Sequence, residues 1–159
     1  MNIMNTNTNI REQKIDTLNE LIAVTRDSAD FYSDAATKVD NPQLKTLFNG
    51  MADSKNGLVG AMSRDVKVEG ARPAEAGTFR GVLHQIYGDV RAKFGDNSDY
   101  AYVSELEETE DRMLGALNNV LLDKDVPSPV KEAVTSYLPK VKEHHNLMRD
   151  RKWAMKAKN

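Results

Sequence analysis

Apolar residues recur at steps of three and four in four long stretches of this chain, and this spacing constrains the fold more than any other feature. On an α-helix, residues three and four apart lie on one face, so each stretch predicts a helix with one buried stripe. The stretches cover residues 17–38, 41–66, 99–122 and 128–155. Four amphipathic helices of this length bury their stripes best against one another, so we predict an all-α fold, a four-helix bundle.

Residues that cap helices mark the expected ends. Thr17 and Glu20 have the spacing of a capping box at the start of the first helix. The pairs Asn-Pro at 41–42 and Ser-Pro at 128–129 each combine a favourable N-cap with proline at the first helical position. The Asn- and Thr-rich residues 1–14 have little to bury and are expected to form a disordered tail. We therefore expect one domain over residues 15–156.

Two features interrupt otherwise regular helical patterns. Pro139 lies inside the fourth stretch, but the apolar phase continues across it, so we predict a kink and not a break. In the second stretch, small residues form a stripe of their own beside the apolar one: Gly50, Ser54, Gly57 and Ala61. Each glycine costs roughly 1 kcal/mol against alanine in a helix. The close approach of a neighbouring helix would explain why this cost is tolerated.

The lengths of the connections predict how the helices are joined. The first and last connections are short, so they should join antiparallel hairpins. The middle connection holds about 30 residues and contains an amphipathic segment at 78–94, so it can run the length of the bundle and leave the second and third long helices parallel. One long, helix-containing crossover is the ferritin-like connectivity. We expect the crossover's apolar face to pack on the bundle, with a dimer surface as the alternative.

Composition excludes several functional classes. The chain has 159 residues, no cysteine and a net charge of −2. Disulfides and cysteine-ligated metals are therefore excluded, and there is no broad positive charge to attract nucleic acid. No apolar run approaches the roughly 18 residues of a membrane span, and the start lacks the pattern of a signal peptide. We expect a cytoplasmic protein that binds neither nucleic acid nor a membrane.

The bundle fold raises the question of a di-iron centre. Such a centre takes a carboxylate from each of two helices and Glu-x-x-His from each of the other two. The sequence has three histidines, and none of them follows a glutamate by three residues. Lys55 lies mid-stripe in the second helix, where its ammonium would repel a metal ion. No complete catalytic set is visible either, so we predict no cofactor, no bound metal and no catalytic residues.

Four polar residues lie on or beside the apolar stripes near the middle of the helices: Thr25, Lys55, Glu110 and His145. They can be read as a reduced mononuclear metal site, or as a buried layer that fixes the register of the helices. The second reading is favoured, because buried polar groups must be paired and such pairs more often specify packing than catalyse. We expect Glu110 to contact His145, or both to share Lys55 as a partner.

The other polar clusters have structural explanations. His144 is one step off the stripe and is expected to be exposed or to lie at a helix boundary. His84 is expected to be a hydrogen-bonded surface residue, with a functional role as the alternative. The acidic run at 105–111 is expected to be a solvated face from which only Glu110 points inward. The basic residues at 149–158 complement the dipole of a helix C-terminus, with binding of an anionic partner as the alternative. The methionines of the stripes are expected to fill the core.

Several short motifs resemble one family. They are LNELI at 18–22, DNPQLK at 40–45, GVLH at 81–84, EETED at 107–111 and EHH at 143–145. In this order and spacing, over nearly the whole chain after the N-terminal tail, they resemble the bacterial DUF2383 group of four-helix-bundle proteins. The resemblance implies a ferritin-like bundle in a bacterial cytoplasm and no particular reaction. Tyr87, where the family pattern suggests tryptophan, and Pro139 depart from it.

Two hypotheses for the function follow. The first is a non-enzymatic bundle that acts by association with a protein partner or with further copies of itself. A role in a stress response is a hypothesis that no residue supports directly. The alternative is a metal-binding or oxidoreductase-like ferritin relative with a reduced site. The missing Glu-x-x-His motif favours the first.

Overall fold

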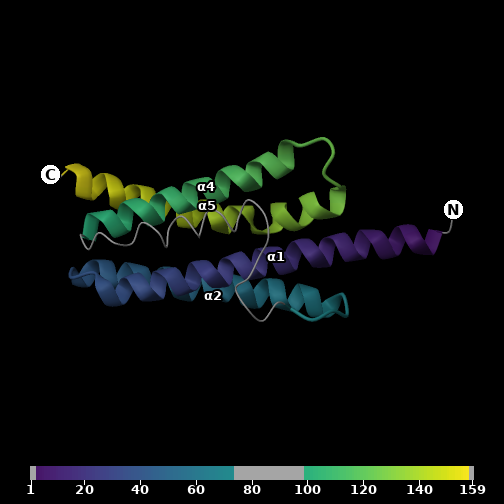
Figure 1. Ribbon diagram of the computed structural model, residues 1–159, viewed down its shortest axis with the longest axis horizontal. Helices are drawn as coiled ribbons and strands as arrows, with labels where there is room; N and C mark the ends of the chain where they lie inside the picture. Colours follow the sequence, from purple (N-terminus) through teal and green to yellow (C-terminus); the bar gives the residue numbers. More distant parts are fainter. Residues whose placement is uncertain (1–2, 74–98, 158–159) are drawn as a thin grey trace.

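The computed structural model describes residues 3–73 and 99–157, and in this part of the chain it contains four helices and no strand (Figure 1). They are α1 (Ile3–Lys38), α2 (Pro42–Val68), α4 (Asp99–Leu122) and α5 (Ser128–Ala157). The prediction of an all-α four-helix bundle is confirmed. The amphipathic segment predicted at 78–94 and His84 lie outside the described residues.

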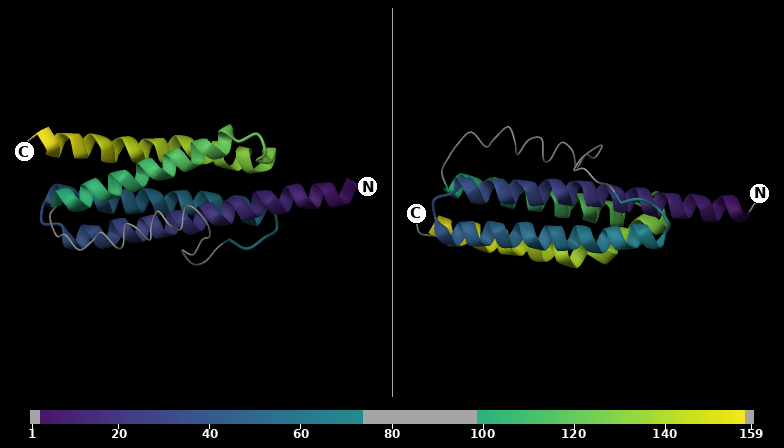
Figure 2. Two further views of the ribbon diagram at one scale, coloured as in Figure 1. Left: turned by 45° about the horizontal axis from the view of Figure 1, so that its top comes forward. Right: turned by 90° about the horizontal axis from the view of Figure 1, so that it is seen from below.

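The helices run in the directions that the loop lengths predict. In Figures 1 and 2, α1 and α2 form one antiparallel hairpin, α4 and α5 form another, and α2 runs parallel to α4. At one end, the Asp99 carboxylate accepts the backbone N–H groups of Asp40 and Asn41, at 2.9 and 3.0 Å. Toward the other end, the Tyr137 hydroxyl donates to the Asp65 carboxylate. These contacts join the α1–α2 hairpin to the α4–α5 hairpin near opposite ends of the bundle.

The ends of α2 show why the chain turns where it does. The Asn41 side-chain oxygen caps the helix by accepting the N–H groups of Gln43 and Leu44, at 2.8 and 3.3 Å. At the other end, Gly70 has a φ of +79°, which only glycine adopts without strain. Its N–H donates to the carbonyl of Lys67 and the next N–H reaches back to Val66, which is the Schellman pattern. The predicted N-cap is thus confirmed.

The N-terminal segment corrects an expectation. Helix α1 begins at Ile3, where we expected a disordered tail and a start near Thr17. The Thr17 hydroxyl donates to a carbonyl one turn earlier and does not cap the helix. The extension is anchored because Arg11 Nε donates to the Glu69 carbonyl at 2.8 Å and Lys14 pairs with the Glu69 carboxylate at 3.1 Å. The end of α2 therefore stabilises a turn of α1 that its own sequence favours only weakly.

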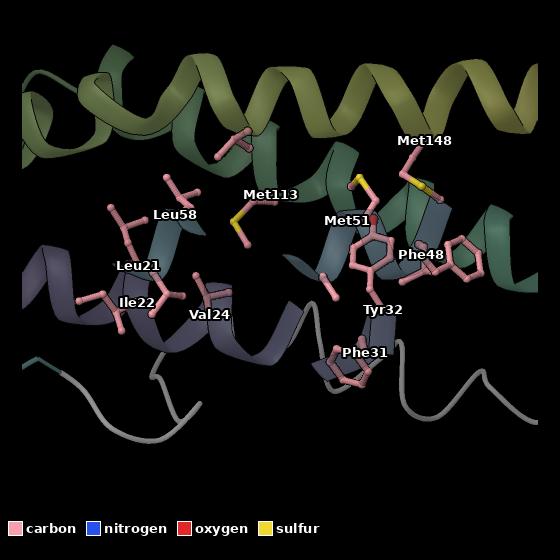
Figure 3. Packing of buried hydrophobic residues seen from close by; sticks show 14 of the residues in the cluster. Leu21, Ile22, Val24, Phe31, Tyr32, Phe48, Met51, Leu58, Met113 and Met148 are labelled. Carbon is pink, nitrogen blue, oxygen red and sulfur yellow. The ribbon is translucent and has the colours of Figure 1, made fainter. Parts of the chain in front are cut away.

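The core fills the space between the four helices, and Figure 3 shows aromatic, aliphatic and methionine side chains interdigitating there. The Tyr32 ring packs against Phe48 with centroids 5.9 Å apart. The prediction that the stripe methionines fill the core is confirmed, and α5 continues through Pro139. The largest fully buried apolar or aromatic side chains are Tyr32, Tyr102, Phe48, Leu18, Ile22, Leu44, Met51, Met62, Leu106 and Met148.

The small-residue stripe on α2 does not have the role we expected. A Cβ atom added to Gly50 or to Gly57 would meet no atom within 4 Å among the described residues, apart from the chain immediately around it. Both glycines are exposed. No neighbouring helix in the described part of the chain approaches closely enough to require them, so the expectation of close packing is wrong here.

Candidate functional site

A hydrogen-bonded ion pair lies in the middle of the bundle and joins three helices. Glu110 of α4 accepts a hydrogen bond from the Tyr32 hydroxyl of α1 at 2.9 Å. The Lys55 ammonium of α2 lies 2.8 Å from one oxygen of the same carboxylate and 3.1 Å from the other. Only 1% of Glu110 and 4% of Lys55 are exposed. We refer to Tyr32, Lys55 and Glu110 as the central triad.

The central triad is electrically balanced. A buried charge without a partner would cost several kcal/mol, and a carboxylate paired with an ammonium and a hydroxyl avoids most of that cost. Both oxygens of Glu110 have a donor. Since the partners come from three helices, the triad is satisfied only when those helices have the correct register.

A second polar contact adds the fourth helix. The Ser54 hydroxyl of α2 lies 2.8 Å from Nε2 of His144 on α5. His144 is 1% exposed, and its Nδ1 has no hydrogen-bond partner in the described structure. Ser54 precedes Lys55 in the chain, so this pair and the central triad lie next to each other on α2.

His144 is held in its neutral form. Burial, together with the positive charges of Lys55 and Lys140, lowers the pKa of its imidazole from 6.5 to about 3. A proton on His144 would place a second cation beside Lys55 in a region of low dielectric. The layer therefore contains one balanced ion pair and one neutral histidine at neutral pH.

The two adjacent histidines correct the sequence analysis. His144, expected to be exposed, is buried, whereas His145 pairs with Asp111 of α4 at 3.2 Å and not with Glu110. Val141 and Met148 are buried seven residues apart, and either histidine between them satisfies a three-and-four spacing. Tertiary packing decides between them: the side of α5 that carries His144 faces Ser54 of α2, and the side that carries His145 faces α4.

Thr25 is buried but belongs to α1 itself. Its hydroxyl donates to the carbonyl of Leu21 at 2.6 Å, one turn earlier. Beside it lies a small cavity of about 20 Å³, whose walls include Thr25, Lys55 and Tyr137 among apolar side chains. This volume has room for about one water molecule and not for a substrate. Thr25 thus lies near Lys55 across the cavity, and in the described part of the chain its hydroxyl bonds to its own helix and not to the central triad.

The charged residues along α4 and α5 partly neutralise one another. Glu107 pairs with Lys152 at 3.2 Å, and Asp111 pairs with His145. The acidic run and the basic end, interpreted separately in the sequence, thus form contacts between the two helices. Burial and the bond to Asp65 also raise the pKa of the Tyr137 hydroxyl, which therefore stays protonated as a donor.

The layer is poorly suited to nucleophilic catalysis. A Ser–His pair needs a third group that orients the imidazole and donors that stabilise an oxyanion. The only Nδ1 that could be oriented has no partner in the described structure. Ser54 lies in the middle of α2, where backbone N–H groups are used within the helix. The Ser54–His144 contact has the distance of a catalytic pair without the surrounding groups.

The layer also does not fit a metal centre. Among residues 3–73 and 99–157, no group of three or more His, Asp or Glu side chains is placed to hold a metal ion. The one buried carboxylate of the layer, Glu110, lies 2.8 Å from the Lys55 ammonium. A metal ion bound by Glu110 would have to displace this ammonium, whose positive charge repels it. The residues present therefore do not fit the di-iron or mononuclear site considered from the sequence.

At the C-terminal end of α5, an aromatic side chain is left exposed. Trp153, the only tryptophan of the chain, is 60% exposed. The guanidinium of Arg149, one turn earlier, stacks on its ring at 5.0 Å from the centroid, and Arg149 also pairs with Asp150 at 3.1 Å. The sequence analysis did not single out Trp153, although the single tryptophan of the chain, placed among basic residues, was a signal that could have found it.

Comparison with known proteins identifies one relationship. Residues 13–123 match the family described as "Domain of unknown function (DUF2383)", which covers more than half of the chain. No curated protein and no solved structure matches. In the described part of the chain, no helix is both long and apolar enough to cross a membrane.

Proposed function

The chain belongs to the DUF2383 family, and we propose that this member is a non-enzymatic bundle that acts by binding another protein or a second copy of itself. The proposal separates the interior, which holds the fold together, from the surface, which would carry the function. A cytoplasmic location, a ferritin-like ancestry and a role in a stress response stay predictions alongside it.

The composition of the interior supports this proposal. The polar groups of the central triad are paired with one another, and the adjacent cavity has room for about one water molecule. Groups that are fully paired at rest have little capacity left for a substrate. The metal-binding alternative would first require the removal of Lys55 from Glu110.

The exposed Trp153 is the observation that carries the proposal. Tryptophan and arginine are the residues most enriched at the energetic centres of protein interfaces, because one large ring buries much area at a low entropic cost. Here both stand together: Arg149 fixes the ring from one side and leaves the other accessible. A protein partner that covers the ring would gain both apolar and cation–π contact.

The test uses Trp153 as its own probe. Because it is the only tryptophan, its fluorescence reports directly on whether the ring is covered. The full chain is used to capture partners from its native cells, and its self-association is followed by sedimentation. We expect a shift of the emission to shorter wavelength in the complex, and loss of the complex with Trp153→Ala.

A matched control is Leu122→Ala. Leu122 is 79% exposed at the end of α4, without a stacked neighbour in the described structure. It should retain the complex, because it removes an exposed apolar side chain elsewhere. A chain that stays monomeric and captures nothing, or one whose complexes survive Trp153→Ala, would contradict the proposal.

A further inference from the structure

A groove on the surface of the bundle holds polar groups that the fold leaves unpaired. It has a volume of about 630 Å³ and lies along the C-terminal half of α2, where α1 runs beside that helix (Figures 1 and 2). We call it the basic groove. Its walls include two cationic, two neutral polar and two apolar residues: Lys67, Arg72, Asn56, Ser63, Val59 and Pro73. The volume falls within the range of about 300–1,000 Å³ that is usual for small-molecule sites.

Two cations stand at one end of the basic groove. Lys67 lies in the last turn of α2, and the backbone of Arg72 is held beside α1, because its carbonyl accepts a hydrogen bond from the Asn19 side chain at 3.3 Å. Neither cationic side chain forms an ion pair in the described part of the chain, and no described wall residue is acidic. The nearby Glu69 carboxylate is already paired with α1. This end of the groove therefore attracts an anionic group.

The turn that ends α2 weakens a charge that would oppose an anion. The C-terminus of a helix carries a partial negative charge because its last carbonyl groups have no partner within the helix. Here the N–H groups of residues 69–71 donate to the carbonyls of Asp65, Lys67 and Val66. With these carbonyls satisfied, the two cations act against little competing negative charge.

The Ser63 hydroxyl points to a ligand at the same end. It lines the groove one turn before Lys67, and its oxygen is buried without a hydrogen-bond partner in the described structure. A buried hydroxyl without a partner costs free energy, and an acceptor bound in the groove would remove that cost. A phosphate group supplies such an acceptor together with the charge that Lys67 and Arg72 attract.

The rest of the groove suits a neutral, flat group. Gly60 leaves the floor without a side chain, and Val59 and Pro73 provide apolar walls. Arg26 also lines the groove, but it already has an interaction partner, so we assign it no role. The part of the ligand beyond the anionic group should therefore be an uncharged ring that covers apolar surface.

Asn56 adds hydrogen-bonding groups at the far end. It lies on the same face of α2 as Lys67 and precedes it by eleven residues, or about 16 Å of helix. Its exposed amide offers one donor group and one acceptor group side by side. This pair matches the adjacent acceptor and donor on the edge of adenine.

We propose that the basic groove binds adenosine monophosphate or a closely similar adenine nucleotide. The phosphate pairs with Lys67 and Arg72, the base lies over Gly60, and the Asn56 amide bonds the edge of the base. A compact anion would leave the apolar walls uncovered, and an alkyl phosphate would leave Asn56 without a partner. This site goes beyond the proposed association function and does not involve Trp153.

The experiment titrates the full chain with adenosine monophosphate by calorimetry. Adenosine, inorganic phosphate and hexyl phosphate serve as references, because each lacks one of the proposed contacts. We expect the nucleotide to bind and each reference to bind at least about tenfold more weakly.

Charge variants test the phosphate end. Lys67→Gln combined with Arg72→Gln should weaken nucleotide binding about tenfold or more and change the binding of uncharged adenosine less than about twofold. The matched control, Lys124→Gln with Lys142→Gln, removes the same charge from exposed positions outside the groove. It should change nucleotide binding less than about twofold, since distant exposed charges are screened.

Two further variants test the base end independently of charge. Asn56→Ala should weaken nucleotide binding at least about fivefold and leave unchanged the weaker binding of inosine monophosphate, whose ring has a carbonyl in place of the amino group. A Cβ at Gly60 would meet only the Arg64 Nη1 atom, at 3.8 Å, so a side chain fits the folded structure. Gly60→Leu should keep or raise the melting temperature but weaken nucleotide binding at least about fivefold, because it fills the floor of the groove.

Three results would overturn the proposal. They are no binding of adenosine monophosphate, binding of any of the three references as tight as that of the nucleotide, and equal weakening by the groove and control pairs. Inorganic phosphate that binds as tightly as the nucleotide would mark a site for compact anions instead. Trp153→Ala should leave nucleotide binding unchanged, so the failure of this site is distinguishable from the failure of the association surface.

Discussion

Two sets of cationic side chains in this molecule are stabilised in opposite ways, one by a buried ion pair and the other by solvent. Lys55 is buried in the middle of the bundle and pairs with Glu110, whereas Lys67 and Arg72 stand in an open groove with no ion pair among the described residues. A buried charge must be matched within the chain, because nothing else can reach it. An exposed charge is solvated at little cost and stays available to a partner. The buried pair serves the fold, and the proposed association would use the surface.

The largest expected effect comes from removing the partner of the buried charge. Lys55→Met leaves the Glu110 carboxylate buried and unpaired, so the free energy of unfolding should fall by roughly 3–5 kcal/mol. The matched change in the groove, Lys67→Met, should alter it by less than about 0.5 kcal/mol. Urea denaturation of both variants measures the difference. Equal decreases in the free energy of unfolding would contradict the distinction between buried and exposed cations.

The tyrosine of the central triad should contribute less. Tyr32→Phe keeps the ring against Phe48 but removes a hydrogen bond to a buried carboxylate, at a cost of about 1.5–3 kcal/mol. Equilibrium unfolding provides the measurement, and a cycle with Lys55→Met gives the coupling. Purely additive losses would mean that the two donors do not act on the same carboxylate.

His144 sharpens the comparison through pH. Its pKa is about 3 when folded and about 6.5 when unfolded, so between these values the unfolded chain binds an extra proton. Stability should therefore fall as the pH falls from 6.5 toward 3, by about 2 kcal/mol at pH 5. Denaturant titrations at pH 7 and 5 should show this loss. His144→Gln should reduce it, and a loss that persists unchanged in this variant would contradict the assignment to His144.

The smallest expected effect has the opposite sign. Gly57→Ala places a methyl group where nothing lies within 4 Å, so it should stabilise α2 by about 0.5–1 kcal/mol. Thermal melting detects this gain. A loss of stability that depends on protein concentration would instead show that another copy packs against the small-residue stripe.

Much of the fold was readable in the sequence because helices are governed by local rules. The Asn41 cap, the helix that begins at Asp99 and the passage through Pro139 all follow from neighbouring residues, and Lys55 and Glu110 follow from the phase of their stripes. Which of His144 and His145 is buried depends on which helix lies on each side of α5. The periodicity of the sequence carries no information about that arrangement.

Other features depend on contacts between distant residues. The N-terminal part of α1 is joined through Arg11 and Lys14 to Glu69, more than 50 residues later in the chain. The basic groove combines Arg26 of α1 with Lys67 of α2, and only the antiparallel register brings them to one surface. The hydrogen bond from the Tyr32 hydroxyl could not be predicted from the sequence. The Tyr32 ring fits the apolar stripe, so the sequence pattern did not distinguish this residue from the rest of the core.

The most direct test of the central claim replaces the interior layer by apolar residues and leaves the surface unchanged. The variant combines Tyr32→Phe, Lys55→Met and Glu110→Leu, which removes all three members of the triad together and leaves none of them unpaired. Its binding of adenosine monophosphate and of the Trp153-dependent partner is measured once circular dichroism and a cooperative melt show that it is folded. We predict the same affinities as for the original chain. A folded variant that binds neither would show that the triad takes part in the function.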